Sequence, residues 1–178
     1  DWTAFEKLFA EALASDVTLL NQINAYLCQR SGKQLRPMLA LLSARMCAPQ
    51  CNCRTIACAV GAEMIHTATL LHDDVADNSD LRRGDLSVKA AFSPAASVLM
   101  GDFWLARAME TVLKDCRLTE VGDFAKCLAE LSEGELFQME KAESLDTTES
   151  DYYTIIDHKT AALFRAAMCS GAHSVNAS

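Results

Sequence analysis

A cluster of acidic and basic side chains occupies residues 63–84, where the sequence reads EMIHTATLLHDDVADNSDLRRG. If the stretch is helical as far as Asp80, then Asp73 and Asp77 lie one turn apart on one face, and His66 lies two turns before Asp73. The stripe would carry one imidazole and three carboxylates. Carboxylates gathered near the C-terminal end of a helix repel one another and face the negative end of its dipole, so they need cations. Mg²⁺ suits such a site, since it takes a few carboxylates together with water and phosphate oxygens.

Two arginines follow the acidic cluster directly. The forked guanidinium groups of Arg82 and Arg83 match the oxygens of a diphosphate. The alternative is a solvated acidic helix end, which is what most runs of charge are. The apolar residues before the aspartates and the two arginines after them favour the metal site.

Three weaker candidates lie elsewhere in the chain. Lys33 and Arg36 stand at the start of an apolar helix, where free N–H groups attract anions, although the segment alone favours ordinary surface cations. Glu135 and Gln138 share a helix face, as either a solvated edge or part of a site. Lys159 lies between apolar residues and either reaches the surface or neutralises a buried anion.

The elements that position these residues read as helices with apolar spacings of three and four. Ser93-Pro94 is typical of a helix start, and Thr148 and Asp151 have the spacing of a capping box. Gly101 inside a helix indicates a close approach by a neighbouring helix, and Asp102 beside it is favoured as a polar anchor. We expect an apolar, deeply buried helix after Pro37, a loop after the acidic cluster, no strand, and an all-α fold. The expected helices cover residues 2–29, 38–47, 55–80, 95–115, 118–143 and 151–172.

Composition limits the class of protein. The 178 residues are 51% hydrophobic and include only 7 Gly and 3 Pro, which favours long helices. The net charge of −8 argues against a nucleic-acid partner, and no apolar run is long enough to span a membrane. The eight cysteines lack the paired spacing of a zinc site. They are expected to be free thiols in a reducing cytoplasm.

Six segments in order carry a resemblance to a known family. They are GKQLRP (32–37), IHTATLLHDDVAD (65–77), LRRG (81–84), GDFWLA (101–106), EGELFQ (133–138) and HKTAALF (158–164). Together they resemble the trans-isoprenyl diphosphate synthases, the polyprenyl synthetase family. The resemblance implies an isoprenoid synthase-type helical bundle.

The resemblance also implies roles for particular residues. Asp73 and Asp77 match the Mg²⁺-binding aspartates of the family's first Asp-rich motif. Arg82 matches a contact to the allylic diphosphate, and Lys159 and Thr160 match a second one. Arg82 and Lys159 are therefore the expected catalytic residues. The residues that match the isopentenyl diphosphate site are Lys33, Arg36, His66 and Arg83.

The implied activity is a prenyl transfer without a covalent nucleophile. An allylic diphosphate ionises when Mg²⁺ and cationic side chains neutralise its leaving group, and isopentenyl diphosphate then attacks the cation in a pocket shielded from water. The family resemblance further implies a homodimer and a product that associates with membranes.

Product length is expected from the residues one turn before Asp73. In the family, bulky aromatic residues there stop chain growth, whereas Ala68 and Thr69 are small. They predict a long-chain polyprenyl product, such as a quinone side chain, with the floor of the tunnel deeper, at Met100, Phe103 or Trp104.

One departure from the family concerns its second Asp-rich motif, which does not follow Ala172. We therefore expect residues 1–178 to be the N-terminal and central part of a single polyprenyl synthetase domain, with an incomplete C-terminal half and little activity alone. The alternatives are a short-chain farnesyl or geranylgeranyl diphosphate synthase and a non-catalytic subunit of a heteromeric synthase. A terpene cyclase is disfavoured, because it has no use for an isopentenyl diphosphate site.

Overall fold

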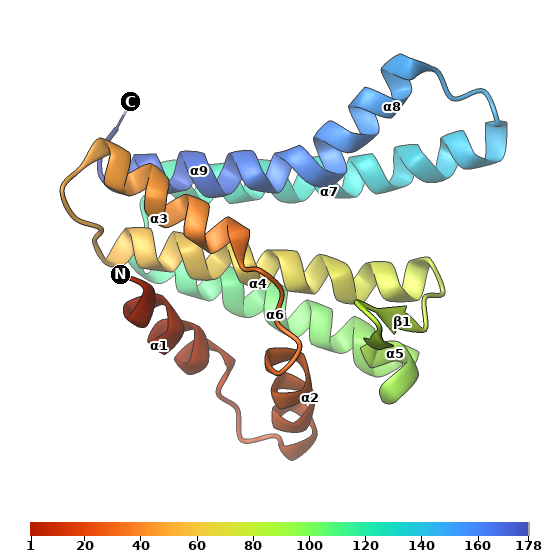
Figure 1. Cartoon of the computed structure of the whole chain (residues 1–178), viewed down its shortest axis with the longest axis horizontal. Coiled ribbons are helices and arrows are strands. Elements are labelled where there is room, and N and C mark those ends of the chain that lie inside the picture. Colours follow the sequence, from red (N-terminus) through yellow and green to blue (C-terminus); the bar gives the residue numbers. More distant parts are fainter. Residues whose placement is uncertain (178) are drawn as a thin grey trace.

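The computed structural model describes residues 1–177, which form a bundle of α-helices with one short β-hairpin (Figure 1). The all-α class is confirmed, and the expectation of no strand is wrong only at this hairpin. The elements are α1 (Trp2–Leu13), α2 (Thr18–Cys28), α3 (Leu35–Cys47), α4 (Cys53–Ala76), β1 (Leu81–Arg82), β2 (Asp85–Leu86), α5 (Val88–Ala91), α6 (Pro94–Asp115), α7 (Leu118–Ser144), α8 (Glu149–Ile156), the π-helical turn η1 (Asp157–Ala161) and α9 (Ala162–Ser174).

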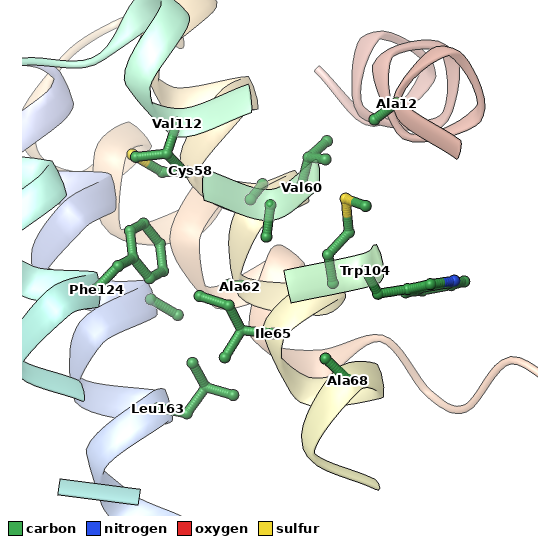
Figure 2. Close-up of a cluster of buried hydrophobic side chains, with 14 of the residues drawn as sticks. Ala12, Cys58, Val60, Ala62, Ile65, Ala68, Trp104, Val112, Phe124 and Leu163 are labelled. Carbon is green, nitrogen blue, oxygen red and sulfur yellow. The ribbon is translucent and has the colours of Figure 1, made fainter. Parts of the chain in front are cut away.

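Helix α4 is the centre of the bundle and contacts α1, α3, α5, α6 and α9. Every residue from Thr55 to Ile65 is buried, as expected for a helix that is surrounded on all sides. Close packing needs small residues, and a methyl group on Gly61 would lie 2.6 Å from the Val112 side chain. Figure 2 shows α4 side chains such as Ile65 packed among side chains from α6, α7 and α9.

The remaining helices pack in pairs around α4. Helix α6 lies along α4, and α7 lies along α9, with α3 against both α4 and α9 (Figure 1). Only Cys116 and Arg117 separate α6 from α7. The C-terminal end of α4 and the distal part of α7 lie at the same end of the bundle (Figure 1).

Four expected helices differ from the structure, and one of them, the expected helix 151–172, is divided into α8, the π-turn η1 and α9. The expected helix 2–29 is broken between α1 and α2, where the Ser15 Oγ accepts a hydrogen bond from the Val17 N–H at 3.2 Å. Helix α3 is not deeply buried, since Met38 and Leu42 are exposed on one side. Helix α4 ends at Ala76, four residues before its expected end at Asp80.

The loop expected after the acidic cluster is a β-hairpin with a two-residue turn. Arg83 and Gly84 occupy the turn with φ of 56° and 89°, the left-handed values that a type I′ turn requires and that glycine adopts without strain. The Tyr26 hydroxyl donates a hydrogen bond of 2.7 Å to the Leu86 carbonyl. The hairpin is therefore fixed to α2, and its two arginines have defined positions.

Several local predictions are confirmed. The Ser93 Oγ accepts a hydrogen bond of 3.0 Å from the Ala96 N–H at the start of α6, and the capping box of Thr148 and Asp151 begins α8. Gly101 lies against the His72 ring of α4. No helix within the described residues combines the length and apolar character needed to cross a membrane.

Candidate functional site

A cavity of about 290 Å³ opens between the C-terminal part of α4, the middle of α7 and the turn η1. Its wall combines a carboxylate and an ammonium group with apolar leucines, a composition suited to a substrate with a charged head and an apolar tail. The lining residues are Thr69, His72, Asp73, Leu131, Ser132, Glu135, Leu136 and Lys159.

Lys159 reaches this cavity because η1 packs tightly on α7. A methyl group on Gly134 would lie 2.6 Å from the His158 Cβ, so only glycine permits the approach. The Lys159 Nζ lies 2.6 Å from Glu135 Oε2 and donates a hydrogen bond of 2.9 Å to Gln138 Oε1. Glu135 and Gln138, left open by the sequence, are thus partners of Lys159. A π-turn within a helix often marks a functional position.

The Asp73 carboxyl carries the clearest electrostatic signal in the cavity. Burial, and then Glu135 and Asp77, raise its pKa to about 6 against the opposing effects of Lys159 and Arg82. Asp77 follows the last residue of α4 and is exposed. A partly buried carboxylate surrounded by excess negative charge is stabilised by a bound cation.

The donor set fits Mg²⁺ as a partial site. Within residues 1–177, no three side chains of His, Cys, Asp or Glu converge closely enough to hold a metal ion by themselves. Mg²⁺ commonly binds through one or two carboxylates and takes its other oxygens from water and substrate phosphates. Asp73 and Asp77 are hard oxygen donors of that kind at one helix end. Asp80 is not, because it lies beyond α4 and pairs with Lys89 at 2.8 Å, so the expected stripe of three carboxylates is wrong at that residue.

The middle aspartate of the motif has a role that the sequence reading missed. The Asp74 side chain is only 4% exposed, and its Oδ1 accepts hydrogen bonds from Arg82 Nε at 2.9 Å and Nη2 at 2.5 Å. Consecutive helical residues point about 100° apart, so Asp73 and Asp74 serve different sides of α4. Asp74 thereby positions the arginine expected to contact the allylic diphosphate.

A second, basic hollow of about 650 Å³ lies nearer the N-terminal end of α4, beside the start of α3 and the hairpin. It brings together all four residues that the resemblance assigned to isopentenyl diphosphate. The lining residues are Ser31, Gly32, Lys33, Gln34, Leu35, Arg36, Glu63, His66 and Arg83.

The positively charged side chains of this hollow lie close together and are partly shielded from water. Burial lowers the pKa of Arg36, whose guanidinium lies 4.3 Å above the Phe164 ring. Its Nε is buried and has no hydrogen-bond partner in the described part of the chain. Burial, then Arg36, Arg83 and Arg82, lower the pKa of His66 to about 3. His66 is therefore a neutral imidazole at physiological pH, and the hollow has spare donors for an anion.

Glu63 is the second residue that the sequence reading missed. Its side chain is buried at 7% exposure, and burial raises its pKa while Arg36 and Arg83 lower it. A carboxylate three residues before His66 lies on the same helix face, which is a signal that the sequence did contain. Glu63 offsets part of the repulsion between the two arginines.

Gly32 explains how Arg83 reaches the hollow. A methyl group on Gly32 would lie 2.6 Å from the Arg83 Cζ, so the guanidinium occupies the space that a side chain would fill. The Arg83 Nη1 also donates a hydrogen bond of 3.2 Å to the Arg30 carbonyl.

Of the predicted site residues, Arg82, Asp77 and Thr160 line neither the cavity nor the basic hollow. Arg82 lines a separate pocket with Asp74 and His66. Thr160 lies on the surface of η1. It is exposed and lines a separate surface hollow with Tyr153 and Ile156. The neighbouring Lys159 faces the cavity, so the two adjacent residues point in different directions.

Of the two small residues that were expected to leave the product tunnel open, only one faces the cavity. Thr69 lines the cavity, whereas Ala68 is buried at 1% exposure in the core (Figure 2). The Trp104 Nε1 donates a hydrogen bond of 2.8 Å to Asn24 Oδ1, and its ring packs against Phe9. Trp104 is directed toward α1 and α2, so it does not form the floor of this cavity.

The chain is similar in sequence to known proteins along most of its length. The family model described as "Polyprenyl synthetase" matches residues 17–178. The chain is 45% identical over 175 residues to the octaprenyl diphosphate synthase of Escherichia coli (strain K12), covering 96% of this chain and 53% of that protein. It is 36% identical over 167 residues to a geranyl-diphosphate-specific all-trans-nonaprenyl-diphosphate synthase of Rhodobacter capsulatus, covering 94% and 51%. The chain thus spans about half the length of the curated relatives it matches.

Solved structures show the same fold. A polyprenyl synthase from Caulobacter crescentus CB15, complexed with calcium and isoprenyl diphosphate, aligns with a TM-score of 0.94 and 35% identity, over 99% of this chain and 54% of that one. A decaprenyl diphosphate synthase from Rhodobacter capsulatus aligns with a TM-score of 0.91 and 35% identity, over 99% and 55%.

Proposed function

Because the chain belongs to the polyprenyl synthetase family, we propose that it forms the substrate-binding part of a prenyltransferase that makes a long-chain polyprenyl diphosphate. The reaction condenses isopentenyl diphosphate with an allylic diphosphate, and the product suits a quinone side chain. The protein works as a cytoplasmic homodimer, and its product enters membranes; these last points rest on the family resemblance.

The observation that carries this proposal is the pair of polar hollows that follow one another along α4. The cavity contains Asp73 and Lys159, and the basic hollow contains Arg36, His66 and Arg83. His66 and Asp73 are seven residues apart, which is about 10 Å along a helix. A reaction between two diphosphate substrates needs two such sites side by side, whereas a terpene cyclase needs one.

The residues divide the chemistry between the two sites. Lys159 from the cavity and Arg82 from its position beside Asp74 hold the diphosphate of the allylic substrate. Lys33, Arg36 and Arg83 hold that of isopentenyl diphosphate. Mg²⁺ bound by Asp73 and Asp77 would supply positive charge that stabilises the departing diphosphate.

Leu131 and Leu136 line the apolar part of the cavity. They keep water from the allylic cation, because apolar walls exclude the nucleophile that would quench it. Thr69 leaves room for the growing chain at the same level. The octaprenyl and nonaprenyl products in the names of the relatives support a long product.

A product-sizing assay tests the proposal. The complete protein is incubated with farnesyl diphosphate, labelled isopentenyl diphosphate and Mg²⁺, and the dephosphorylated product is sized by chromatography. The expected result is a chain well beyond the C20 length. A product that stops at C20, or at C15 when geranyl diphosphate replaces farnesyl diphosphate as primer, would establish a short-chain synthase instead. No product from either primer would favour the non-catalytic subunit.

A matched pair of variants tests the role of Thr69. Thr69→Phe places an aromatic ring in the cavity and is expected to shorten the product. Thr69→Val keeps the volume and removes only the hydroxyl, which donates a hydrogen bond of 2.9 Å to the His66 carbonyl, so it should leave product length unchanged. Equal product lengths for Thr69→Phe and the unmodified protein would show that growth is limited elsewhere.

A further inference from the structure

Two thiols from distant parts of the chain lie together where the start of α4 meets the link between α6 and α7. Cys58 lies near the start of α4, and Cys116 lies in the two-residue link between α6 and α7. Their Sγ atoms are 3.6 Å apart. All eight cysteines are free thiols in the structure, and neither thiol of this pair belongs to the diphosphate sites.

Neighbouring groups hold the two sulfur atoms close to each other. Cys58 is completely buried in the core (Figure 2), and the Cys116 Sγ is within 3.6 Å of the Arg54 carbonyl. Arg54 in turn pairs at 3.0 Å with the buried Glu120 at the start of α7. The contact is therefore part of the joint between α4 and the α6–α7 corner.

The geometry permits a bond between the sulfur atoms after a small movement. A disulfide has an S–S length of about 2.0 Å, so the sulfur atoms must approach by about 1.6 Å. Cys116 has an extended backbone with φ of −93° and ψ of 164° and lies outside both helices. A residue in a short link adjusts by that amount more easily than one within a packed helix.

We propose that Cys58 and Cys116 are a thiol pair that forms an intramolecular disulfide when the protein meets a peroxide. The half-buried Cys116 thiol first attacks one oxygen of hydrogen peroxide, which gives Cys116 sulfenic acid and releases water. The Cys58 sulfur then attacks the Cys116 sulfur, which forms the S–S bond and releases a second water. In total, two thiols lose two hydrogen atoms, and one peroxide is reduced to two waters.

The two thiols have different parts in this sequence. The hydrogen bond between the two thiols, and then burial, raise the pKa of Cys58 far above its usual range. Cys58 therefore does not react with oxidants directly. Cys58 is also completely buried, so the sulfur that it can attack is the one 3.6 Å away on Cys116.

The bond would stabilise the fold without touching either diphosphate site. It closes a loop from residue 58 to residue 116 and so restricts the unfolded chain. Cys58 precedes Asp73 by fifteen residues, which is about 22 Å along α4. The expected effect is a higher Tm for the oxidised protein that returns to its original value on reduction.

Differential alkylation tests the proposal in the complete protein. After treatment with a small excess of hydrogen peroxide, free thiols are blocked, disulfides are reduced, and the released thiols are labelled and located by mass spectrometry. Cys58 and Cys116 should acquire the second label together and to the same extent. The exposed Cys47 and Cys53 report on unselective oxidation.

Two variants exclude other routes. Cys58→Ser should leave Cys116 as a sulfenic acid that dimedone traps, and Cys116→Ser should leave Cys58 unoxidised. In both variants the peroxide-induced rise in Tm should vanish. The proposal is overturned if dimedone labels Cys116 equally in the unmodified protein and in Cys58→Ser, or if Cys116 becomes linked to a cysteine other than Cys58.

Discussion

Removing the charge of Asp73 should stabilise the metal-free protein at neutral pH. Its pKa is raised from 3.8 to about 6, first by burial and then by Glu135, so the folded protein holds this proton more tightly than the unfolded chain does. Stability is therefore gained as the pH falls from about 6 toward 3.8, and it is lost as the pH rises through the same window. Asp73→Asn, which is neutral at every pH, should be more stable than the unmodified protein above pH 6 and no more stable near pH 4.

The size of the effect follows from the shift. Each unit of pKa difference corresponds to about 1.4 kcal/mol, so a rise of about two units gives an upper value of about 3 kcal/mol. Part of the Asp73 side chain remains in contact with water, and solvent screening reduces this value to about 1–2 kcal/mol. The gain should shrink by about 1 kcal/mol between pH 8 and pH 5, where the folded protein regains its proton.

Urea unfolding at pH 8 and pH 5, in buffer with a chelator, measures both free energies of unfolding. Asp77→Asn is the matched control, because it removes the same charge from the same helix end at an exposed position. It should change stability by less than about 0.5 kcal/mol at either pH. A loss of stability in Asp73→Asn at pH 8, or an equal gain at both pH values, would refute the argument from burial.

Three further substitutions test the packing of the two sites. Asp74→Asn leaves the Arg82 guanidinium without its buried anionic partner. The change should lower the free energy of unfolding by about 1–3 kcal/mol. In steady-state kinetics it should raise the KM for the allylic substrate more than the KM for isopentenyl diphosphate. Gly32→Ala displaces the Arg83 guanidinium and should raise the KM for isopentenyl diphosphate about tenfold, with Tm nearly unchanged; an unchanged KM would contradict the assignment of Arg83. Gly171→Ala forces a methyl group against the backbone of α3 and should cost about 1–3 kcal/mol in urea unfolding, while a neutral result would show that α3 and α9 shift freely.

The helix starts near residues 93 and 148 could be predicted from their capping residues. Ser93, Thr148 and Asp151 make the hydrogen bonds that their types and spacing predicted, because a cap depends on residues three positions apart. The metal aspartates and the basic residues of the hollow were likewise assigned from short segments. Their convergence in space came from the family resemblance, since no local pattern brings residue 33 to residue 83.

Long-range contacts account for what the sequence did not predict. The break between α1 and α2 is held by Asn24, whose Nδ2 donates a hydrogen bond of 2.9 Å to the Leu13 carbonyl, and whose Oδ1 accepts one from Trp104. Trp104 was one of the three residues expected at the tunnel floor, because they lie on the helix beside the acidic cluster's own helix. Asn24, eighty residues earlier in the chain, instead holds the Trp104 ring toward α2. Helical periodicity cannot predict a contact between residues so far apart in sequence.

Arg82 connects the two sites electrostatically. It is among the charges that lower the pKa of His66, after burial and the closer arginines, and it is also among those that oppose the raised pKa of Asp73. Asp74 holds it in place beside α4. An anion that binds Arg82 would therefore reduce the positive field at His66 in the basic hollow. Because this one guanidinium acts on both His66 and Asp73, we expect an allylic diphosphate bound to it to lower the positive charge that the basic hollow presents to isopentenyl diphosphate.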